Sequence, residues 1–436
     1  MIRQIVDLSA PDRPAPAVAA LLAELNAFTV PRALRRWQRD VLETGTLRAT
    51  WPLDGASLVC DATLWRDYGL FAYRFVHGPF TLWLLTGGCK TGWHIAGLVM
   101  LPLGLAFAGG GEDLALVHYH VPALAAVRAP QGKAEAQVVV GHANFAHHLW
   151  NELPALAAAR PTAIARTLVL WEPILPLDQL VDWPGALCRV AERDVRPPPD
   201  QLAAGVLLPL GSTRIPAGLA ARVRAACAAH DVVPPGRPGA AALSLSLRSM
   251  YRRPINQLAF CRAVLARLPA SLDVYLDGFA MPDDIDVPGR YDVAQFRAWQ
   301  QETAALASEL MAGAPADGPR LVDATLCTVP QAIALGARLD AYLSPHGTQQ
   351  HKIGWVHQVP GVVHTSPHVA QSDQAAWLAD QCEHHAPVAY LPAAMTGTVP
   401  GQGRFAGDPW YDDYQFIDVE DAVSWAVRAL MPYIGR

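Results

Sequence analysis

The chain has 436 residues, of which 52% are hydrophobic and 17% charged, and its formal net charge is −5. This length exceeds a single hydrophobic core, so we expect two domains, and the composition is that of a globular protein. The negative charge argues against general nucleic-acid affinity, which requires basic stripes on the surface.

The seven cysteines are widely spaced and form no CxxC pair, so the sequence indicates neither a zinc ribbon nor a redox dithiol. The first residues show no apolar core of a signal peptide. The longest apolar run, Ile95–Ala108, contains a proline and is too short to span a bilayer. We therefore expect a cytoplasmic protein without a transmembrane segment, and peripheral contact with a membrane stays open.

The N-terminal half begins with a helical pattern over residues 10–45 and changes to short strands between about 50 and 140. Residues 142–235 then alternate between helix and strand. We expect strands at Leu64–Trp65, Phe71–Phe75, Phe80–Leu85, Leu114–His118, Gln137–Val140, Thr167–Trp171 and Gly205–Leu210.

Val232–Gly239 is rich in proline and glycine and is the best candidate for a linker. We therefore predict an N-terminal domain over 1–235, with its β-rich segment at 50–140, and a C-terminal domain over 240–436. Strands and helices alternate again after the linker, which indicates βαβ units and a parallel sheet. The expected strands are Ala242–Leu247, Leu272–Leu276, Leu321–Val322, Ala341–Leu343 and Gly361–His364, and the expected helices Asn256–Leu268, Phe296–Met311, Val329–Ala337 and Val419–Met431.

Two α/β halves joined by a hinge predict a cleft between them, and ligands of open α/β sheets bind at the carboxyl ends of the strands. The strand that ends at Ser344 is followed by His346-Gly347, and a helix is predicted to begin at Thr348. Backbone N–H groups and the positive end of that helix suit a phosphate, and His346 and Lys352 would add donors. The alternative is an ordinary strand–turn–helix corner with Thr348 as its N-cap.

Two further segments place polar side chains at strand ends. Arg248 follows a predicted strand, Arg253 lies in the loop after it, and Asn256 starts the next helix. Guanidinium groups suit diphosphate geometry, although a solvated basic loop explains the same residues. Gln331 begins another helix and is explained by a capping box with Thr328, although it could also contact a ligand.

The segment from His142 to Pro154 carries the candidate base. His147 and Asn151 lie four residues apart, as do His148 and Glu152, so each pair shares a helix face. A histidine oriented by a neighbour is a plausible general base. A structural histidine cluster is the alternative, and a metal site is a third, although the spacing matches no metal motif.

Other motifs are absent or weak. The sequence has no GxSxG and no P-loop, which weakens serine-hydrolase and NTPase interpretations. Asp284-Ile-Asp286 has the DxD spacing of some metal-dependent sugar transferases, but it lies in a proline-flanked acidic loop that we expect to be solvated.

Three segments, in this order along the chain, resemble the motifs of the family 61 glycosyltransferases. The stretch from Asn144 to Pro154 is similar to Asn-x-x-His-Trp-Leu-x-Asp-x-Leu-Pro, and Arg248, Arg253 and Asn256 are similar to Arg-x4-Arg-x2-Asn. Gln331, with His346-Gly347 fifteen residues further on, matches the Glu-Gln…His-Gly-Ala-Gly segment in spacing. The three cover roughly residues 144 to 360.

The resemblance implies a GT-B-like fold of two Rossmann-like domains and inverting sugar transfer from a nucleotide-sugar, with the donor held by the C-terminal half. Two positions depart from the family pattern: its Asp is Asn151 here, and Thr348-Gln349 replaces its Ala-Gly.

Together, the residues and the resemblance predict a metal-independent transferase without a cofactor. Arg248, Arg253 and the helix after Gly347 would stabilise the diphosphate, and His147, or else Glu152, would take the proton of a glycan hydroxyl. Surface polysaccharide or glycoconjugate synthesis is the expected setting. A non-catalytic carbohydrate- or nucleotide-binding protein is the main alternative, and a histidine-rich metallohydrolase is a third. Trp410, Tyr411 and Tyr414 could stack on sugars or simply pack.

Overall fold

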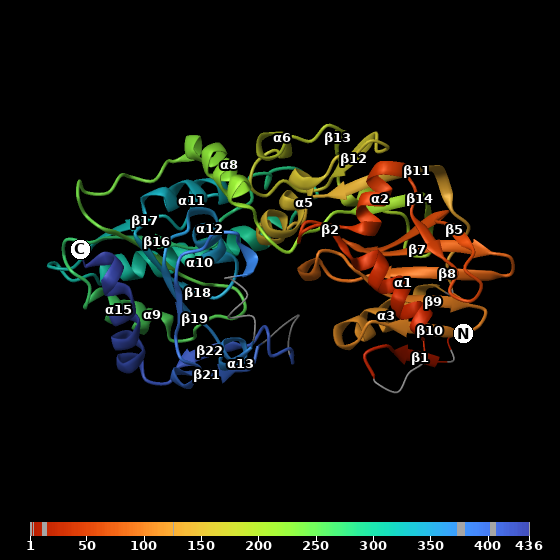
Figure 1. Ribbon diagram of the computed structural model, residues 1–436. Coiled ribbons are helices and arrows are strands. Elements are labelled where there is room, and N and C mark those ends of the chain that lie inside the picture. Colours follow the sequence, from red (N-terminus) through yellow and green to blue (C-terminus); the bar gives the residue numbers. More distant parts are fainter. Residues whose placement is uncertain are drawn as a thin grey trace. The chain divides into compact units, whose positions relative to one another are not determined.

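The computed structural model describes Ile2 and residues 4–10, 15–124, 126–372, 380–401 and 407–435, and the chain forms two compact units (Figure 1). Unit 1 contains Met1–Trp171 and Val181–Arg214, and unit 2 contains Glu172–Leu180 and Ile215–Arg436. Both units combine helices with a sheet, so the expected α/β class is confirmed.

Unit 1 is built on one ten-stranded sheet with the order β1-β10-β9-β8-β7-β6-β14-β11-β12-β13. The strands are β1 (Gln4–Asp7), β6 (Ala62–Asp67), β7 (Leu70–His77), β8 (Phe80–Thr86), β9 (Ile95–Leu101), β10 (Leu105–Ala108), β11 (Gln131–Val140), β12 (Arg166–Val169), β13 (Ala186–Arg189) and β14 (Leu202–Pro209).

Strand β14 joins the two halves of this sheet. It pairs antiparallel with β6 and parallel with β11, while β6 to β10 form an antiparallel meander and β11 to β13 run parallel. The β-rich segment and the alternating α/β segment of the sequence therefore share one sheet.

The helices of unit 1 include α3, which replaces an expected strand. Leu114–His118 lies inside α3 (Gly111–Leu124), because Val117 and Leu124 recur at helical spacing and are buried, and acidic residues occupy the first turn. The expected helical region 10–45 is interrupted by the hairpin of β2 (Phe28–Val30) and β3 (Leu34–Arg35). The other elements are α1 (Pro16–Asn26), α2 (Arg36–Thr44), α4 (Phe145–His147), α5 (Leu153–Ala158), α7 (Glu192–Val195), β4 (Arg48–Thr50) and β5 (Ser57–Val59).

Unit 2 is built on a six-stranded sheet in which all strands run parallel, with the order β17-β16-β15-β18-β19-β20. Numbered from the first strand of the unit, this is 3-2-1-4-5-6, the order of the doubly wound nucleotide-binding fold. The strands are β15 (Ala242–Ser246), β16 (Asp273–Asp277), β17 (Arg320–Asp323), β18 (Ala341–Pro345), β19 (Gly361–His364) and β20 (Val388–Tyr390).

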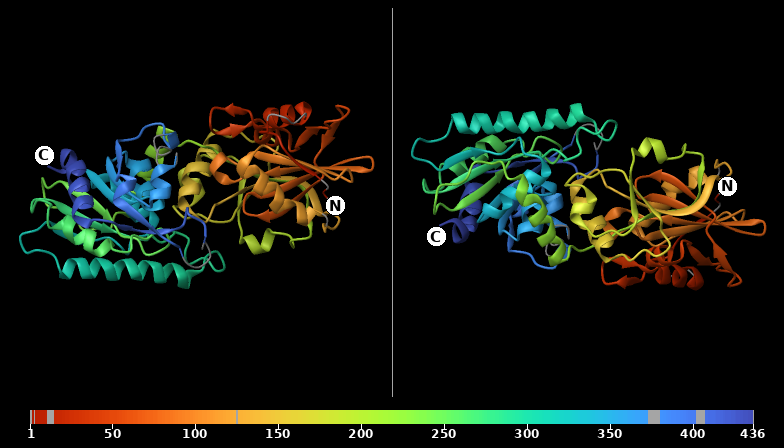
Figure 2. Two further views of the ribbon diagram at one scale, coloured as in Figure 1. Left: turned by 90° about the horizontal axis from the view of Figure 1, so that it is seen from below. Right: turned by 90° about the horizontal axis from the view of Figure 1, so that it is seen from above.

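Alternate residues of these strands enter two separate cores, because successive side chains of a strand point to opposite faces. Leu243 and Leu343 pack with α9, α10 and α15 on one face, whereas Tyr275 and Tyr342 pack with α11 and α12 on the other. The long helix α10, teal in Figure 2, lies along the outside of the unit. The elements are α6 (Leu177–Leu180), α8 (Ala217–Cys227), α9 (Gln257–Leu265), α10 (Val293–Ala312), α11 (Val329–Leu335), α12 (Thr348–His357), α13 (Pro367–Gln371), α15 (Val419–Ile434), β21 (Thr396–Val399) and β22 (Asp413–Phe416).

The boundary between the units differs from the predicted one. The chain enters unit 2 for the second time at Ile215, earlier than the expected linker Val232–Gly239, which lies within unit 2. Helix α8 belongs to unit 2 because it packs against α11 and α12. In the described part of the chain, no helix has both the length and the apolar character that crossing a membrane requires.

Candidate functional site

The first candidate site lies at the carboxyl ends of β15 and β18, the two central strands of unit 2. The connections from these neighbours leave in opposite directions, which makes this the topological switch point, where doubly wound sheets bind their ligands. Arg248 follows β15 and His346-Gly347 follows β18, so the sheet brings together two segments about a hundred residues apart.

Gly347 has a backbone conformation that only glycine adopts readily, with φ 121° and ψ −152°. A Cβ atom there would lie 3.2 Å from Nη2 of Arg252 and 3.5 Å from Nη1 of Arg248. The expected helix begins at Thr348, as predicted. The N–H of Gly347 donates to Oε1 of Gln350 at 3.2 Å, so this one N–H is already bonded within the turn.

Arg248 is 2% exposed and is held by backbone carbonyls. Its Nε donates to the carbonyl of Tyr251 at 2.8 Å and its Nη1 to the carbonyl of His346 at 3.0 Å. Burial and the nearby charge of Arg252 lower the pKa of Arg248 to about 9, so it remains a cation at neutral pH. Burial and the charge of Arg248 also lower the pKa of His364, at the end of β19, to about 3.

Two residues assigned to the diphosphate have other partners. Nη1 of Arg253 lies 3.5 Å from Oε1 of Glu302 and its Nη2 lies 3.8 Å from Oδ2 of Asp413, and the Arg253 side chain is 41% exposed. The side chain of Asn256 donates to the carbonyl of Phe416 and accepts from its N–H, both at 3.0 Å, and so joins this loop to β22. Arg253 and Asn256 therefore serve to hold the loop in place.

The other residues predicted to bind the diphosphate near Gly347 are Lys352, Ser344, His346 and Thr348. Lys352 is buried and donates to Oδ1 of Asp277 at 2.8 Å and to the carbonyl of Gly278 at 3.1 Å, so its ammonium group is neutralised inside unit 2. The hydroxyl of Ser344 donates to the carbonyl of Pro345 and is fully buried. His346 is almost buried, with Nδ1 3.3 Å from the Tyr390 hydroxyl, and Thr348 is partly exposed.

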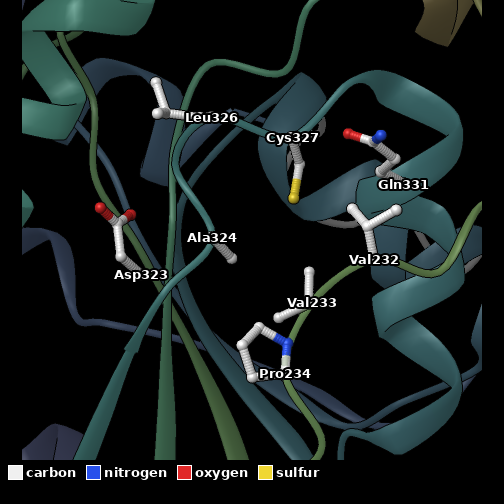
Figure 3. Close-up of a pocket in the computed structure, with 8 residues that line it drawn as sticks. All are labelled: Val232, Val233, Pro234, Asp323, Ala324, Leu326, Cys327 and Gln331. Carbon is white, nitrogen blue, oxygen red and sulfur yellow. The ribbon is translucent and has the colours of Figure 1, made fainter.

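Gln331 lies elsewhere in unit 2, at a small pocket beside the end of β17. Its Oε1 accepts from the N–H of Thr328 at 2.8 Å, which confirms the predicted capping box. The pocket measures about 210 Å³, below the usual range for small-molecule sites. Figure 3 shows the Cys327 sulfur pointing inward among apolar side chains. The lining residues are Val232, Val233, Pro234, Asp323, Ala324, Leu326, Cys327 and Gln331.

The acidic DxD segment is not solvated as a whole. Asp286 is exposed, but the side chain of Asp284 is only 8% exposed and bonds with Nη1 of Arg290 at 2.6 Å and the hydroxyl of Tyr291 at 2.8 Å. It also accepts from the N–H of Glu172 at 2.8 Å and thereby anchors the segment 172–180 in unit 2. Asp284 is therefore a structural residue.

The second candidate site follows β11 in unit 1. Gly141 comes close to the backbone of Trp171, since a Cβ atom there would lie 2.4 Å from that residue's N and O atoms. Asn144 caps α4 by accepting from the N–H of Ala146. The chain then forms a π-helical turn over His148–Glu152, a feature frequently found at functional sites.

Glu152 is the centre of a closed network. Its Oε2 accepts from the N–H groups of Gly141 and His142, at 3.0 and 2.8 Å, and lies 2.8 Å from Nδ1 of His148, while the hydroxyl of Tyr68 bonds with Oε1. Burial raises the pKa of Glu152 to about 8 and, with the charge of His142, lowers the pKa of His148 to about 3. At neutral pH the pair is thus mostly uncharged, and Glu152 is 1% exposed.

His147 and Asn151 have a geometry that suits a base. Nδ2 of Asn151 donates to the carbonyl of Ser212 at 2.6 Å, so Oδ1 of Asn151 faces Nδ1 of His147 at 3.0 Å. The His147 Nδ1 must therefore donate, which leaves the lone pair of the neutral ring on Nε2. His147 is only partly buried, unlike Glu152.

Two contributors, Tyr68 and Arg252, were not assigned to a site from the sequence. Tyr68 lies in the turn between β6 and β7, and its ring contacts those of His142 and Trp171. Nothing in its local pattern marks it, because the pairing of distant strands brings it there. Arg252 is the other, and its position follows from a left-handed backbone that sequence spacing does not reveal. The described residues include no group of three or more His, Cys, Asp or Glu side chains placed to share a metal ion.

No protein-family model matches this chain, and no curated protein matches it significantly. We therefore infer a function from the residues of the two sites and from the resemblance of their motifs.

Proposed function

We propose that this protein is an inverting glycosyltransferase that moves a sugar from a nucleotide-sugar donor to a hydroxyl group of a glycan or another acceptor. The observation that carries the proposal is the position of Arg248 and Gly347 at the topological switch point of the parallel sheet of unit 2. A cation that remains charged when buried and a glycine that leaves room for a ligand suit a diphosphate group.

Sugar transfer by single displacement requires two kinds of help. The negative charge that develops on the leaving diphosphate is stabilised by fixed cations and dipoles, here Arg248 and the N-terminal end of α12. The acceptor hydroxyl loses its proton as it attacks, and we assign this proton to Nε2 of His147. Glu152 is a poorer choice of base, because it is buried and its carboxyl group is already bonded to four neighbours.

The proposal includes a GT-B-like arrangement, with unit 1 as the acceptor side and unit 2 as the donor side. It also includes metal-independent catalysis in the cytoplasm, in the synthesis of a surface polysaccharide or glycoconjugate. The buried cation takes the charge-neutralising role that a divalent ion has in metal-dependent transferases.

A second candidate function is that of a non-catalytic carbohydrate- or nucleotide-binding protein. One observation favours it: Asn151 cannot accept a proton, and the nearest carboxyl group, that of Glu152, is enclosed. Turnover separates the two functions.

The test is to measure sugar transfer, and hydrolysis of nucleotide-sugars, by the purified protein and by the variants Arg248→Ala and His147→Ala. We expect transfer to fall about 100- to 1,000-fold in Arg248→Ala, on the scale of a lost oxyanion donor, and at least 100-fold in His147→Ala. Arg262→Ala and His77→Ala are matched controls, because both side chains bond with a carboxylate near the surface, outside the two sites.

Circular dichroism and thermal unfolding verify that each variant is folded, and Arg248→Lys is included because Arg248→Ala removes a buried side chain. Folded Arg248 and His147 variants with wild-type rates would show that the site is wrong. Binding of a nucleotide-sugar without any turnover by the wild type would favour the second function.

A further inference from the structure

Two arginines follow one another in the loop after β15, and they differ in every respect that matters for binding an anion. Arg253 is paired with Glu302 and Asp413. Arg252 borders Gly347 with its Nη2 atom, and among the described residues no carboxylate lies within ion-pair distance of Arg252 or Arg248. We propose that Arg252, together with Arg248, contacts the diphosphate group of the donor; this inference deepens the proposed function and depends on it.

The backbone of Arg252 is the first argument. Its φ of 60° lies in the left-handed region, which disfavours side chains with a Cβ atom by about 1 to 2 kcal/mol. Glycine is the usual residue in this conformation, and Arg252 is neither glycine nor one of the short polar residues that tolerate it. Strain of this kind persists where the side chain has a role that repays it.

The surroundings of the Arg252 guanidinium are the second argument. Its central carbon lies 5.9 Å from the ring centroid of Tyr251 and 5.8 Å from that of Tyr411, so two aromatic rings orient the group. Its Nε atom is buried and, within the described part of the chain, has no hydrogen-bond partner. Aromatic contacts hold the side chain without neutralising its charge, which leaves the charge for an anion.

The pairing of two cations is the third argument. The positive charges of Arg248 and Arg252 repel each other, and both side chains border the position that a Cβ of Gly347 would occupy. Such a pair is unfavourable by itself because like charges repel at short range. A diphosphate carries at least two negative charges and offers oxygens to both guanidinium groups, so its binding would remove this repulsion.

The test uses inorganic pyrophosphate as the probe, titrated into the full-length protein by calorimetry. We expect Arg252→Ala to weaken the affinity about 10- to 100-fold, on the scale of a charge-assisted hydrogen bond. Arg253→Ala is the matched control and should change it less than threefold. Orthophosphate, titrated in parallel, should bind at least tenfold more weakly than pyrophosphate if two guanidinium groups share the ligand.

A second variant separates binding from folding. Arg252→Gly also removes the guanidinium but relieves the left-handed strain, so it should lose affinity as Arg252→Ala does and yet unfold roughly 2 to 4 °C above Arg252→Ala. Wild-type affinity in Arg252→Ala, or an equal loss in Arg253→Ala, would overturn the assignment of Arg252. Absence of pyrophosphate binding by the wild type would also overturn it.

The proposed function fails separately. If pyrophosphate binds through Arg252 but no nucleotide-sugar is turned over, the anion site stands and the transferase activity does not. If sugar is transferred at wild-type rates by Arg252→Ala, the activity stands and this assignment does not.

Discussion

The two candidate sites of this protein treat buried charge in opposite ways. In unit 1, Glu152 is surrounded by groups that bond with both of its oxygens, and the pair it forms with His148 is mostly uncharged at neutral pH. In unit 2, Arg248 and Arg252 are bonded to carbonyls or flanked by rings, and their positive charges have no carboxylate partner among the described residues.

The difference shows how a polar cluster is to be interpreted. A network that satisfies a buried carboxyl group holds a fold together, as Glu152 joins the turn of Tyr68 to the loop of His142. A cluster with surplus charge has no counter-charge in the fold, and a ligand is the simplest source of that counter-charge. In the proposed function, His147 of unit 1 is accordingly the base, and the arginines of unit 2 bind the anion.

The largest effect is expected at Lys352. It follows Gly347 by five residues in the sequence, but its charge is already paired with that of Asp277. Lys352→Met leaves the carboxylate of Asp277 buried without its partner, so we expect the free energy of unfolding to fall by about 3 to 5 kcal/mol. Chemical denaturation measures this change.

The double variant Lys352→Met/Asp277→Leu is the control for Lys352, because it removes both charges and should recover most of the lost stability. Undiminished stability in Lys352→Met, combined with weaker pyrophosphate binding, would instead place Lys352 with the arginines as a ligand contact, which is the role expected from the sequence.

A smaller effect is expected from Asn151→Asp, which introduces the acid of the family motif. Nδ2 of Asn151 donates to the Ser212 carbonyl, so an aspartate would place a carboxylate oxygen against that carbonyl oxygen in a fully buried position. We expect a loss of about 2 to 3 kcal/mol in stability and no gain in transfer rate. A variant with wild-type stability and faster transfer would show that unit 1 accepts a charged acid, contrary to the comparison. Asn151→Ala serves as the control for loss of the amide alone.

The smallest effect concerns pH. The folded-state pKa of Glu152, about 8, is above its ordinary value, so the folded protein keeps a proton that the unfolded chain releases, and stability falls as the pH rises toward 8. The lowered pKa of His148 acts in the opposite direction, mainly below its ordinary value of 6.5.

Between pH 6.5 and 8 the comparison with Glu152→Gln isolates Glu152, because the buried histidines, whose pKa values are lowered, are present in both proteins. Over this interval we expect the wild type to lose about 1 to 2 kcal/mol of stability relative to Glu152→Gln, in urea unfolding at each pH. Glu302→Gln, at an exposed carboxylate, should keep the wild-type slope. Equal slopes for the wild type and Glu152→Gln would mean that Glu152 is ionised throughout and that its network is not neutral.

Most of the parallel sheet of unit 2 was predictable, because its strands are short apolar runs between amphipathic helices. Leu114–His118 was predicted wrongly as a strand because five residues are too few to separate the two periods, whereas the whole of α3 shows the helical one. Strands β9 and β10 were missed, because their apolar run has neither period, and only pairing with β8 and with each other divides it.

The site was predictable where spacing along one element decides the contact. The pairs His147–Asn151 and His148–Glu152 form as a separation of four predicts. Spacing gives no information on what meets a side chain from another element, so the burial of Lys352 against Asp277 and the pairing of Arg253 could not be seen. The direction of Arg252 depends on one backbone angle, which no local pattern specifies.

The path of the chain between the two units limits how the protein can be divided into fragments. The backbone passes from one unit to the other after Trp171, Leu180 and Arg214, so three covalent connections link them. A single proteolytic cut in the Pro/Gly segment 232–239 divides unit 2 and leaves part of it attached to unit 1. Expression of unit 2 alone from Ile215 omits Glu172–Leu180, whose first residue bonds with Asp284, so a gene for that unit must carry this short segment as a graft.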